Sequence, residues 1–255
     1  MKLEIVQYLA LKDNYNYLIR DPESGKVATI DPSEPNPTRN KLQEKKWHLD
    51  YILNTHHHPD HIGGNPELAR EFRPQVIIPE YDQHRIPGFH KTVKDNDEFL
   101  FGEHKVKVMF LPGHTLGHIV YYFEAAKALF CGDVVFSMGC GRLFEGTPKQ
   151  MFESLKRIKE LPDDTMIYCA HEYTEDNGRF ALSLEPSNSK LIERLKEVRE
   201  LRKGLLPTVP SNLKQEKLTN PFLRWDSMEL RMTLGMEKAT DLEVFTETRK
   251  RKDVF

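Results

Sequence analysis

The chain has 255 residues, which is enough for one large domain or for a domain with a smaller appendage. Its 37 basic and 39 acidic residues nearly cancel, so no overall field would attract nucleic acid or a membrane surface. No stretch reaches the roughly 20 apolar residues that span a bilayer, and we expect no secretory signal. The 3 widely spaced cysteines argue against a disulfide framework and favour a reducing, cytoplasmic compartment.

The first two-thirds of the chain alternates short β-branched or aromatic runs with turn signals. These runs predict strands at Leu3–Val6, Asn16–Arg20, Val27–Ile30, Tyr51–Leu53, Val76–Ile78, Val106–Phe110, Ile119–Phe123, Ala128–Phe130 and Met166–Cys169. Amphipathic stretches between them predict helices near Pro37–Lys46, from Asn65 and over Thr147–Leu161.

The pattern changes at about residue 174. Asn188–Arg202 is charged and carries apolar residues at three- to four-residue intervals, which predicts a helix. A stretch with several prolines follows, and a second helical run begins near Asp241. Many strands with interleaved helices, followed by helices only, indicate an α/β domain with a smaller C-terminal helical domain.

The segment Thr55–His61 packs four histidines and one aspartate into seven residues, directly after a predicted strand. Histidine and carboxylate are common partners in metal binding. His56 and His58 are two residues apart, so in an extended chain they project to the same side. Asp60 and His61 follow at a turn. Two pairs aimed in different directions favour two adjacent ions, whereas a histidine-rich surface loop would not require the strand before or the glycines after.

Three further residues could complete such a site. His114, Asp133 and His171 each follow the end of a predicted strand, where side chains from neighbouring strands can meet in one cleft. Singly, each could be an ordinary capping or hydrogen-bonding residue. Together with Thr55–His61, they indicate a metal centre.

These motifs resemble those of a known superfamily. THHHPDH at 55–61, with GH at 113–114, GD at 132–133 and AH at 170–171, is similar to the metallo-β-lactamase superfamily. A narrower resemblance, to glyoxalase II (hydroxyacylglutathione hydrolase), runs nearly the whole chain and rests on Asp13-Asn14-Tyr15, GCGRLFEGT at 139–147, HEYT at 171–174 and NPFLRW at 220–225. It implies an αββα sandwich with a C-terminal helical domain, divided as 1–173 and 174–255.

The resemblance also implies a complete set of ligands for two divalent metal ions. It assigns His56, His58 and His114 to the first ion, Asp60, His61 and His171 to the second, and Asp133 to both. Zinc is the first expectation, and iron or manganese would suit the same mixed imidazole and carboxylate ligands.

The implied activity is hydrolysis of a glutathione thioester. S-D-lactoylglutathione would give glutathione and D-lactate, the second step of methylglyoxal detoxification, by attack of a hydroxide that bridges the two ions. Asp60 would accept a hydrogen bond from this nucleophile and Asp133 would orient it, with no serine or cysteine nucleophile. We expect a cytoplasmic monomer that acts on a small molecule.

Glutathione carries two carboxylates, so its site should contain cations. The basic run at 249–252 alone is more typical of a solvated helix face, but the resemblance implies that Arg249 and Lys252 bind the glycine carboxylate and that Tyr173 contacts the substrate. Two positions depart from the family pattern. Arg142 stands where lysine is frequent, and Phe144 stands where a tyrosine is often found, so one hydrogen bond to glutathione would be missing.

Other interpretations remain for some residues and for the whole chain. His57 is expected to point away from His56 and His58, and His118 is either a core residue or a neighbour of the site. A persulfide dioxygenase with a single iron, a lactonase or nuclease, and a non-catalytic metal-binding module are the alternative functions. The complete ligand set disfavours the dioxygenase and the module, and the later motifs disfavour the lactonase and the nuclease.

Overall fold

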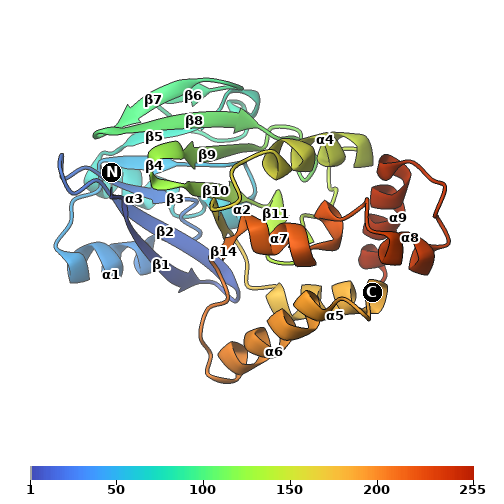
Figure 1. Cartoon of the computed structure of the whole chain (residues 1–255). Coiled ribbons are helices and arrows are strands. Elements are labelled where there is room, and N and C mark those ends of the chain that lie inside the picture. The colour runs from blue at the N-terminus through green and yellow to red at the C-terminus, as the bar shows by residue number, and fades with distance from the viewer. Residues whose placement is uncertain (1) are drawn as a thin grey trace. The chain divides into compact units, whose positions relative to one another are not determined.

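The computed structural model describes residues 2–255 (Figure 1). The spatial contacts between residues divide the chain into two compact units. The first unit comprises the residues up to Phe110 together with 117–132, and the second comprises 111–116 and 133–255. Among residues 2–255, no helix is both long enough and apolar enough to cross a membrane.

The first unit contains a mixed sheet with strands in the order β1-β2-β3-β4-β5-β6. These strands span Glu4–Ala10, Asn14–Arg20, Val27–Ile30, Tyr51–Leu53, Gln75–Pro79 and Lys91–Val93. Pairing is antiparallel from β1 to β3 and parallel from β3 to β6. All except β6 coincide with predicted runs; β6 has the sequence Lys-Thr-Val, in which no apolar run marks a strand. Ile30 pairs with Leu53, so the chain leaves β3 and β4 at the same edge of the sheet.

Four antiparallel strands form the second layer of this unit. They span Glu98–Phe101 (β7), His104–Phe110 (β8), Ile119–Phe123 (β9) and Ala128–Gly132 (β10), and they pair in that order. Every residue of β9 and β10 is buried, which agrees with their uninterrupted apolar sequences. The sequence interpretation missed β7, which begins with a charged residue after a turn.

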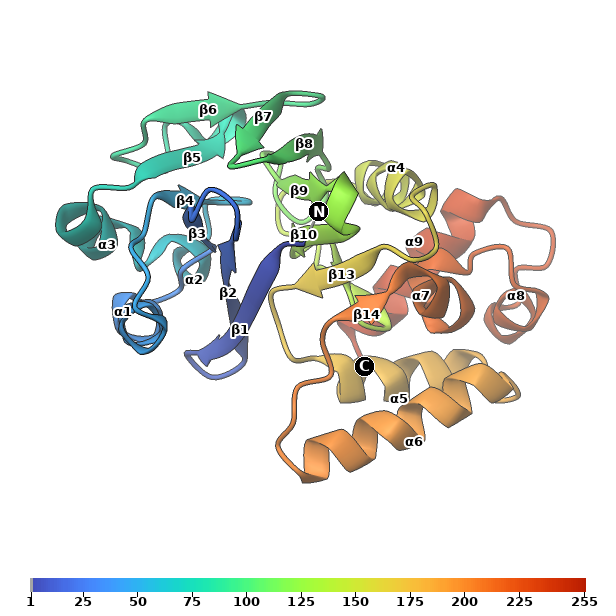
Figure 2. The same cartoon turned by 60° about the vertical axis from the view of Figure 1, so that its left-hand side comes forward.

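The two layers pack face to face within the first unit (Figure 2). The ring of Tyr17 on β2 meets the edge of Phe130 on β10 at a centroid distance of 5.4 Å. The Tyr121 hydroxyl on β9 donates a hydrogen bond to the Asn54 carbonyl oxygen at 2.9 Å. A buried phenol needs such a partner, so this bond fixes where β9 lies against the end of β4.

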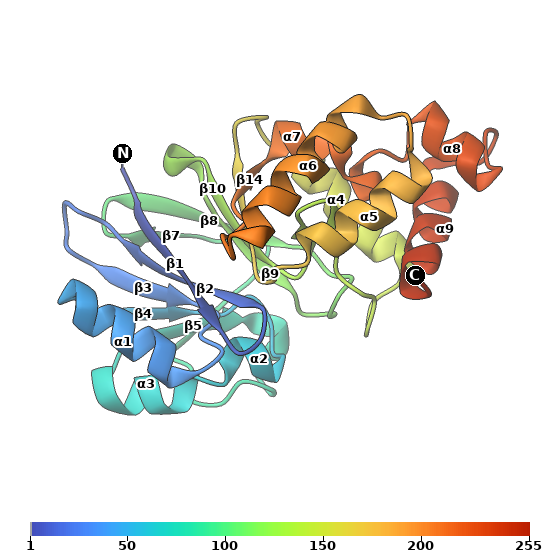
Figure 3. The same ribbon diagram turned by 90° about the horizontal axis from the view of Figure 1, so that it is seen from below.

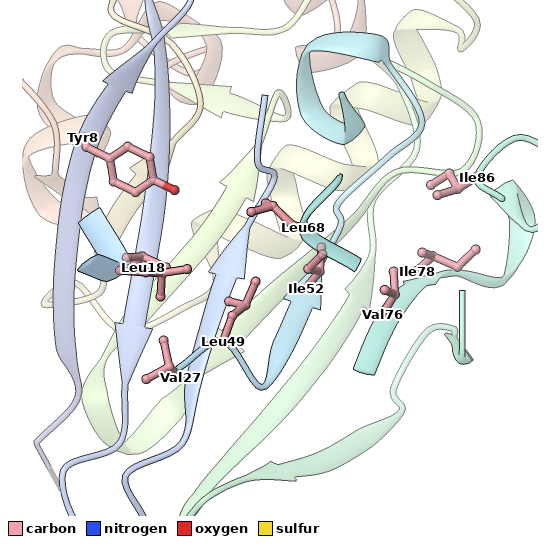
Figure 4. Packing of buried hydrophobic residues seen from close by; sticks show 10 residues of the cluster. Tyr8, Leu18, Val27, Leu49, Ile52, Leu68, Val76, Ile78 and Ile86 are labelled. Atoms are coloured by element: carbon pink, nitrogen blue, oxygen red, sulfur yellow. The ribbon is translucent and has the colours of Figure 1, made fainter. Parts of the chain in front are cut away.

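Two helices cover the outer face of the first sheet. Helix α1 (Pro35–Lys45) and helix α3 (Asn65–Phe72) connect the parallel strands, as a parallel crossover requires, and lie side by side (Figure 3). Each contributes one fully buried leucine, Leu42 and Leu68, to a core built on the sheet. Figure 4 shows this packing around Ile52. Burying each such side chain stabilises the fold by about 1.5–3 kcal/mol.

The second unit is mainly helical. Its helices are α4 (Pro148–Lys159), α5 (Thr174–Leu184), α6 (Ser189–Lys203), α7 (Leu213–Thr219), α8 (Met228–Leu234) and α9 (Asp241–Asp253). It also contains the hairpin β11–β12 (Val135–Phe136 and Gly139–Cys140) and the pair β13–β14 (Met166–Cys169 and Ser211–Asn212). The expectation of helices only after residue 174 is therefore wrong at β14, where two residues pair with β13.

Buried polar side chains hold the turn of the β11–β12 hairpin. Arg194 on α6 is paired with Glu216 on α7 and donates to the Ser137 hydroxyl at 2.8 Å. The Met138 backbone N–H donates to Glu216 at 2.9 Å, and Asn220 donates to the carbonyl oxygens at both ends of the turn. We call Arg194, Glu216 and Asn220 the hairpin network. Because its members are buried, it fixes the hairpin through hydrogen bonds that water cannot replace.

We predict that Glu216→Gln lowers the free energy of unfolding by about 3–5 kcal/mol, because it leaves the buried charge of Arg194 uncompensated. Urea unfolding followed by circular dichroism would measure the loss. Glu193→Gln on the same helix as Arg194 is the matched control, since Glu193 forms an exposed pair with Lys190 and its change should stay within about 0.5 kcal/mol. Equal unfolding midpoints for the two variants would contradict the role of the network.

Candidate functional site

The histidine-rich segment lies in the first unit, between β4 and the short helix α2 (Pro59–Ile62). Proline at the first helical position begins α2 and places Asp60 and His61 in its first turn. The His56 and His58 rings lie 4.7 Å apart between centroids, as expected for side chains two residues apart in an extended chain. His56 and His61 are fully buried. The two expected pairs therefore lie on two different local structures, a loop and a helical turn.

Asp31 orients both buried histidines of this segment. Its carboxylate lies 3.1 Å from His61 Nδ1 and accepts hydrogen bonds from the Thr55 backbone N–H at 2.8 Å and the Thr55 hydroxyl at 2.6 Å. The Thr55 hydroxyl is in turn 3.0 Å from His56 Nδ1. These contacts direct Nδ1 of both rings toward protein and leave Nε2 as the nitrogen that can bind an ion.

The sequence interpretation missed Asp31. The residue follows β3, as Asn54 and Thr55 follow β4, and the parallel pairing of the two strands brings these ends together. A polar residue directly after one of two parallel neighbouring strands was the available signal. Asp31 has a φ of 48°, in the left-handed region that aspartate tolerates better than most residues.

Asp60 is held from β2. The Asn14 side-chain amide donates to Asp60 Oδ2 at 3.0 Å and to the Asp60 carbonyl oxygen at 3.3 Å. Asp60 Oδ2 also lies 3.5 Å from His61 Nε2. Asn14, the middle residue of the Asp13-Asn14-Tyr15 motif, therefore fixes the Asp60 carboxylate beside His61 Nε2.

His114, Asp133 and His171 come together in the second unit. Asp133 Oδ2 lies 3.3 Å from His114 Nε2 and 3.5 Å from His171 Nε2. His114 Nδ1 lies 2.8 Å from the Arg142 carbonyl oxygen, to which it would donate, so its Nε2 faces the carboxylate. A Cβ atom at Gly141 would lie 2.0 Å from the Asp133 carbonyl oxygen, so this approach of the two segments requires glycine.

The donor sets in both units fit a divalent metal ion. In the first unit, Asp60 Oδ2 lies 3.5 Å from His61 Nε2, the ring nitrogen that Asp31 does not contact. In the second unit, the Asp133 carboxylate faces two imidazole nitrogens. Buried imidazoles with the other ring nitrogen bonded to an acceptor are typical of metal-binding histidines.

The residues predicted to bind the substrate line a pocket of about 450 Å³ in the second unit. Among the side chains that line it are His114, Asp133, Arg142, Phe144, Tyr173, Arg249 and Lys252. The Tyr173 ring stacks on His171 with centroids 4.8 Å apart, and the exposed Phe144 ring meets His114 edge-on at 5.2 Å. Aromatic rings and cations therefore surround the same space as two candidate metal ligands.

Arg249 and Lys252 lie on α9 and form the cationic side of this pocket. Arg249 is 3% exposed, donates to the Cys140 carbonyl oxygen at 2.9 Å and pairs with Asp253 at 3.0 Å. Burial and the neighbouring Arg249 charge lower the pKa of Lys252. The basic run is thus more than a solvated helix face at these two positions, and a bound carboxylate would relieve the repulsion between them.

The cysteines are poor nucleophiles. None of the three forms a disulfide, and all are buried. Burial raises the pKa of Cys140 to about 11 and that of Cys169 to about 12. Near neutral pH both are almost entirely neutral thiols, whereas a nucleophilic cysteine needs its thiolate. The expectation that no cysteine attacks the substrate is consistent with this burial.

Family models match nearly the whole chain. One described as "Metallo-beta-lactamase superfamily" matches residues 12–171, and one described as "Hydroxyacylglutathione hydrolase C-terminus" matches residues 172–255. The hydroxyacylglutathione hydrolases of Brucella ovis and Brucella suis biovar 1 are each 50% identical over 254 residues, which cover 100% of this chain and 99% of each relative.

Solved structures show the same fold at lower identity. ETHE1 from Myxococcus xanthus superposes with a TM-score of 0.70 at 23% identity, over 97% of this chain and 90% of that one. The BLEG-1 B3 metallo-beta-lactamase gives a TM-score of 0.66 at 19% identity, over 87% and 99%. The fold is thus a metallo-beta-lactamase fold followed by a helical C-terminal domain, as expected. With its matches to both family models and its 50% identical relatives, the chain belongs to the hydroxyacylglutathione hydrolase family of the metallo-beta-lactamase superfamily.

Proposed function

We propose that this chain hydrolyses S-(2-hydroxyacyl)glutathione, with S-D-lactoylglutathione as the substrate and D-lactate and glutathione as products, in methylglyoxal detoxification. One observation carries the proposal. The pocket of the second unit is lined both by candidate metal ligands, His114 and Asp133, and by cations that suit the carboxylates of glutathione. The names of the 50% identical relatives support the same substrate.

We propose that seven residues hold two divalent metal ions. His56, His58 and His114 would bind one ion, Asp60, His61 and His171 the other, and Asp133 both. The orientation of His56 and His61 by Asp31 and Thr55, and of His114 by the Arg142 carbonyl, supports this assignment. Zinc is the first candidate, and iron and manganese suit the same ligand types. When bound, such ions supply a nucleophile at neutral pH and polarise the thioester carbonyl.

Two carboxylates would act on the reacting groups. Asp60, which Asn14 holds in place, would accept a hydrogen bond from the attacking oxygen, and Asp133 would fix its direction. The leaving group is a thiolate, whose conjugate acid has a pKa of about 8.5, so the chain needs no strong general acid.

The glutathione part would bind in the pocket of the second unit. Arg249 and Lys252 would bind the glycine carboxylate, Tyr173 would donate from its hydroxyl, and Arg142 would add a third positive charge. Phe144 lines the pocket with an exposed ring that has no hydroxyl to donate. We therefore propose that affinity, rather than the type of reaction, differs from that of relatives with a tyrosine at this position.

We further propose that residues 1–173 form the catalytic domain and 174–255 the substrate-binding domain. The two family models meet between residues 171 and 172, which supports this division. We also propose a cytoplasmic monomer, and three cysteines that form no disulfide agree with a reducing compartment. Light scattering after gel filtration would test the oligomeric state.

A persulfide dioxygenase with a single iron, the alternative that the sequence resemblance left open, is the second candidate. We favour the hydrolase, since the sequence provides ligands for a second ion. Incubation of the purified protein with S-D-lactoylglutathione should release free thiol. Oxygen consumption with glutathione persulfide, without any thioester cleavage, would instead favour the dioxygenase.

We predict that Asp133→Ala lowers kcat/KM for S-D-lactoylglutathione at least about 100-fold, and that a chelator abolishes activity until metal is restored, because this carboxylate would bind both ions. Thiol release measures both effects. Asp226→Ala is the control, since Asp226 is an exposed partner of Lys159. Thiol release at the wild-type rate without Asp133 would refute the mechanism.

We predict that Arg249→Met combined with Lys252→Met raises KM about tenfold or more with little change in kcat. Charge-assisted hydrogen bonds of about 1.5–3 kcal/mol would be lost from the ground state and the transition state alike. Steady-state kinetics measure the split between KM and kcat. Lys250→Met is the matched control, because Lys250 is an exposed residue of the same helix. An unchanged KM would contradict the carboxylate site.

We predict that Phe144→Tyr lowers KM about two- to tenfold, because one added hydrogen bond to glutathione contributes about 0.5–1.5 kcal/mol. The same kinetic assay measures the change, with kcat expected to stay constant. Phe136→Tyr is the control for adding a hydroxyl to the pocket, since Phe136 lines it but is almost fully buried. An equal KM for the Phe144 variant and the unaltered protein would show that this position does not reach the glutathione backbone.

A further inference from the structure

The middle residue of the histidine run, His57, contacts a different set of groups from its neighbours. Its Nδ1 lies 3.4 Å from Asp82 Oδ2, and Arg85 Nη1 lies 3.2 Å from both ring nitrogens. Asp82 belongs to the short 3-10 helix Glu80–Asp82 that follows β5, and its side chain has no exposed surface. Its Oδ1 also lies 3.7 Å from Arg85 Nη1, so a histidine and an arginine both lie beside this buried carboxylate.

The chemistry of the two partners suits one tautomer of His57. A neutral imidazole has one donor nitrogen and one acceptor nitrogen. Asp82 only accepts, so it suits a proton on Nδ1, and Arg85 only donates, so it suits Nε2 as acceptor. Both ring nitrogens are thereby engaged by protein groups. This agrees with the expectation that His57 is not a metal ligand.

Asp82 also packs against a second segment of the first unit. A Cβ atom at Gly117 would lie 2.5–2.7 Å from the Asp82 carboxylate atoms, so only glycine allows this approach. The next residue, His118, stacks on His56 with ring centroids 4.6 Å apart. Asp82 therefore contacts Thr55–His61 directly at His57. It also lies against Gly117, whose neighbour His118 packs on His56.

The chain between β4 and α2 has no regular structure of its own. The Thr55 carbonyl oxygen accepts from the Ile119 N–H, and the His58 carbonyl oxygen accepts from the His61 N–H, but residues 54–58 belong to no helix or strand. Side-chain contacts must therefore help to set its course. Asp31 does so on one side through Thr55, and Asp82 is the buried carboxylate that contacts the run at His57.

We propose that Asp82 is a positioning residue for the metal site: it fixes His57, and with it the backbone from which His56 and His58 present their rings. The proposal rests on the proposed metal ligands, but it does not depend on the identity of the thioester. Its effect is on the geometry and affinity of metal binding, since a supporting residue of this kind typically contributes a factor of about 10–100 in affinity.

Titration of the metal-free protein with Co²⁺, followed by visible absorption, tests the proposal. We expect Asp82→Asn to weaken Co²⁺ binding about 10–100-fold and to change the absorption bands, which report ligand geometry. Asp21→Asn is the matched control. Asp21 is an equally buried aspartate of the first unit that accepts hydrogen bonds from Ser24 and from the Glu103 N–H, so its loss should lower stability without changing Co²⁺ affinity.

Variants of His57 and Gly117 change the residues that contact Asp82. They keep the test valid if Asp82→Asn does not fold. His57→Gln retains a side-chain N–H that can reach Asp82, whereas His57→Leu does not, so the leucine variant should bind Co²⁺ more weakly. Gly117→Ala should weaken binding by displacing the Asp82 carboxylate. Wild-type Co²⁺ affinity and spectra in the folded variants would overturn the proposal. Since Co²⁺ binding is measured without substrate, failure of the thioester assay alone would count only against the proposed activity.

Discussion

The Asp31 carboxylate accepts hydrogen bonds from Thr55, in the loop after β4, and lies beside His61 in the helix α2 that follows. One oxygen accepts from the Thr55 backbone N–H and the other from the Thr55 hydroxyl, and the second also lies beside His61 Nδ1. This single buried group therefore sets which nitrogens of His56 and His61 remain for an ion. An imidazole whose one nitrogen is hydrogen-bonded to protein can bind an ion only through its other nitrogen. The proposed chemistry of the first unit therefore depends on the contacts of Asp31 with Thr55 and His61.

In the second unit, a different set of buried polar side chains holds a loop in place. The hairpin network of Arg194, Glu216 and Asn220 fixes the β11–β12 turn from two helices and the residue that follows them. The hairpin in turn carries Phe136, whose ring packs on Tyr173, and Cys140, whose carbonyl oxygen accepts from Arg249. The hairpin network thus supports the wall of the pocket in which the α9 cations lie. It also explains why residues from 133 onward cluster with the C-terminal helices in one compact unit.

The two units contain different kinds of functional group. The first provides a rigid sandwich from whose strand ends carboxylates and imidazoles project. The second provides one carboxylate with two imidazoles, together with the cations and aromatic rings of the pocket. The pocket is therefore lined by two of the proposed metal ligands, Asp133 and His114. This arrangement is a reason to read KM and kcat separately in every variant proposed above.

The sequence by itself determined most strands of the first unit, the metal-binding character of Thr55–His61 and the family. Periodicity and strand-end motifs are local properties, so they can be read without contacts. Residue pairs far apart in the sequence were decided only by the tertiary structure. Asp31 meets His61 because β3 and β4 are parallel neighbours, and Asp82 meets His57 because β5 lies beside β4. The strands β6 and β14 were equally out of reach, because neither contains an apolar run and their hydrogen-bonding partners, rather than their own residues, make them strands.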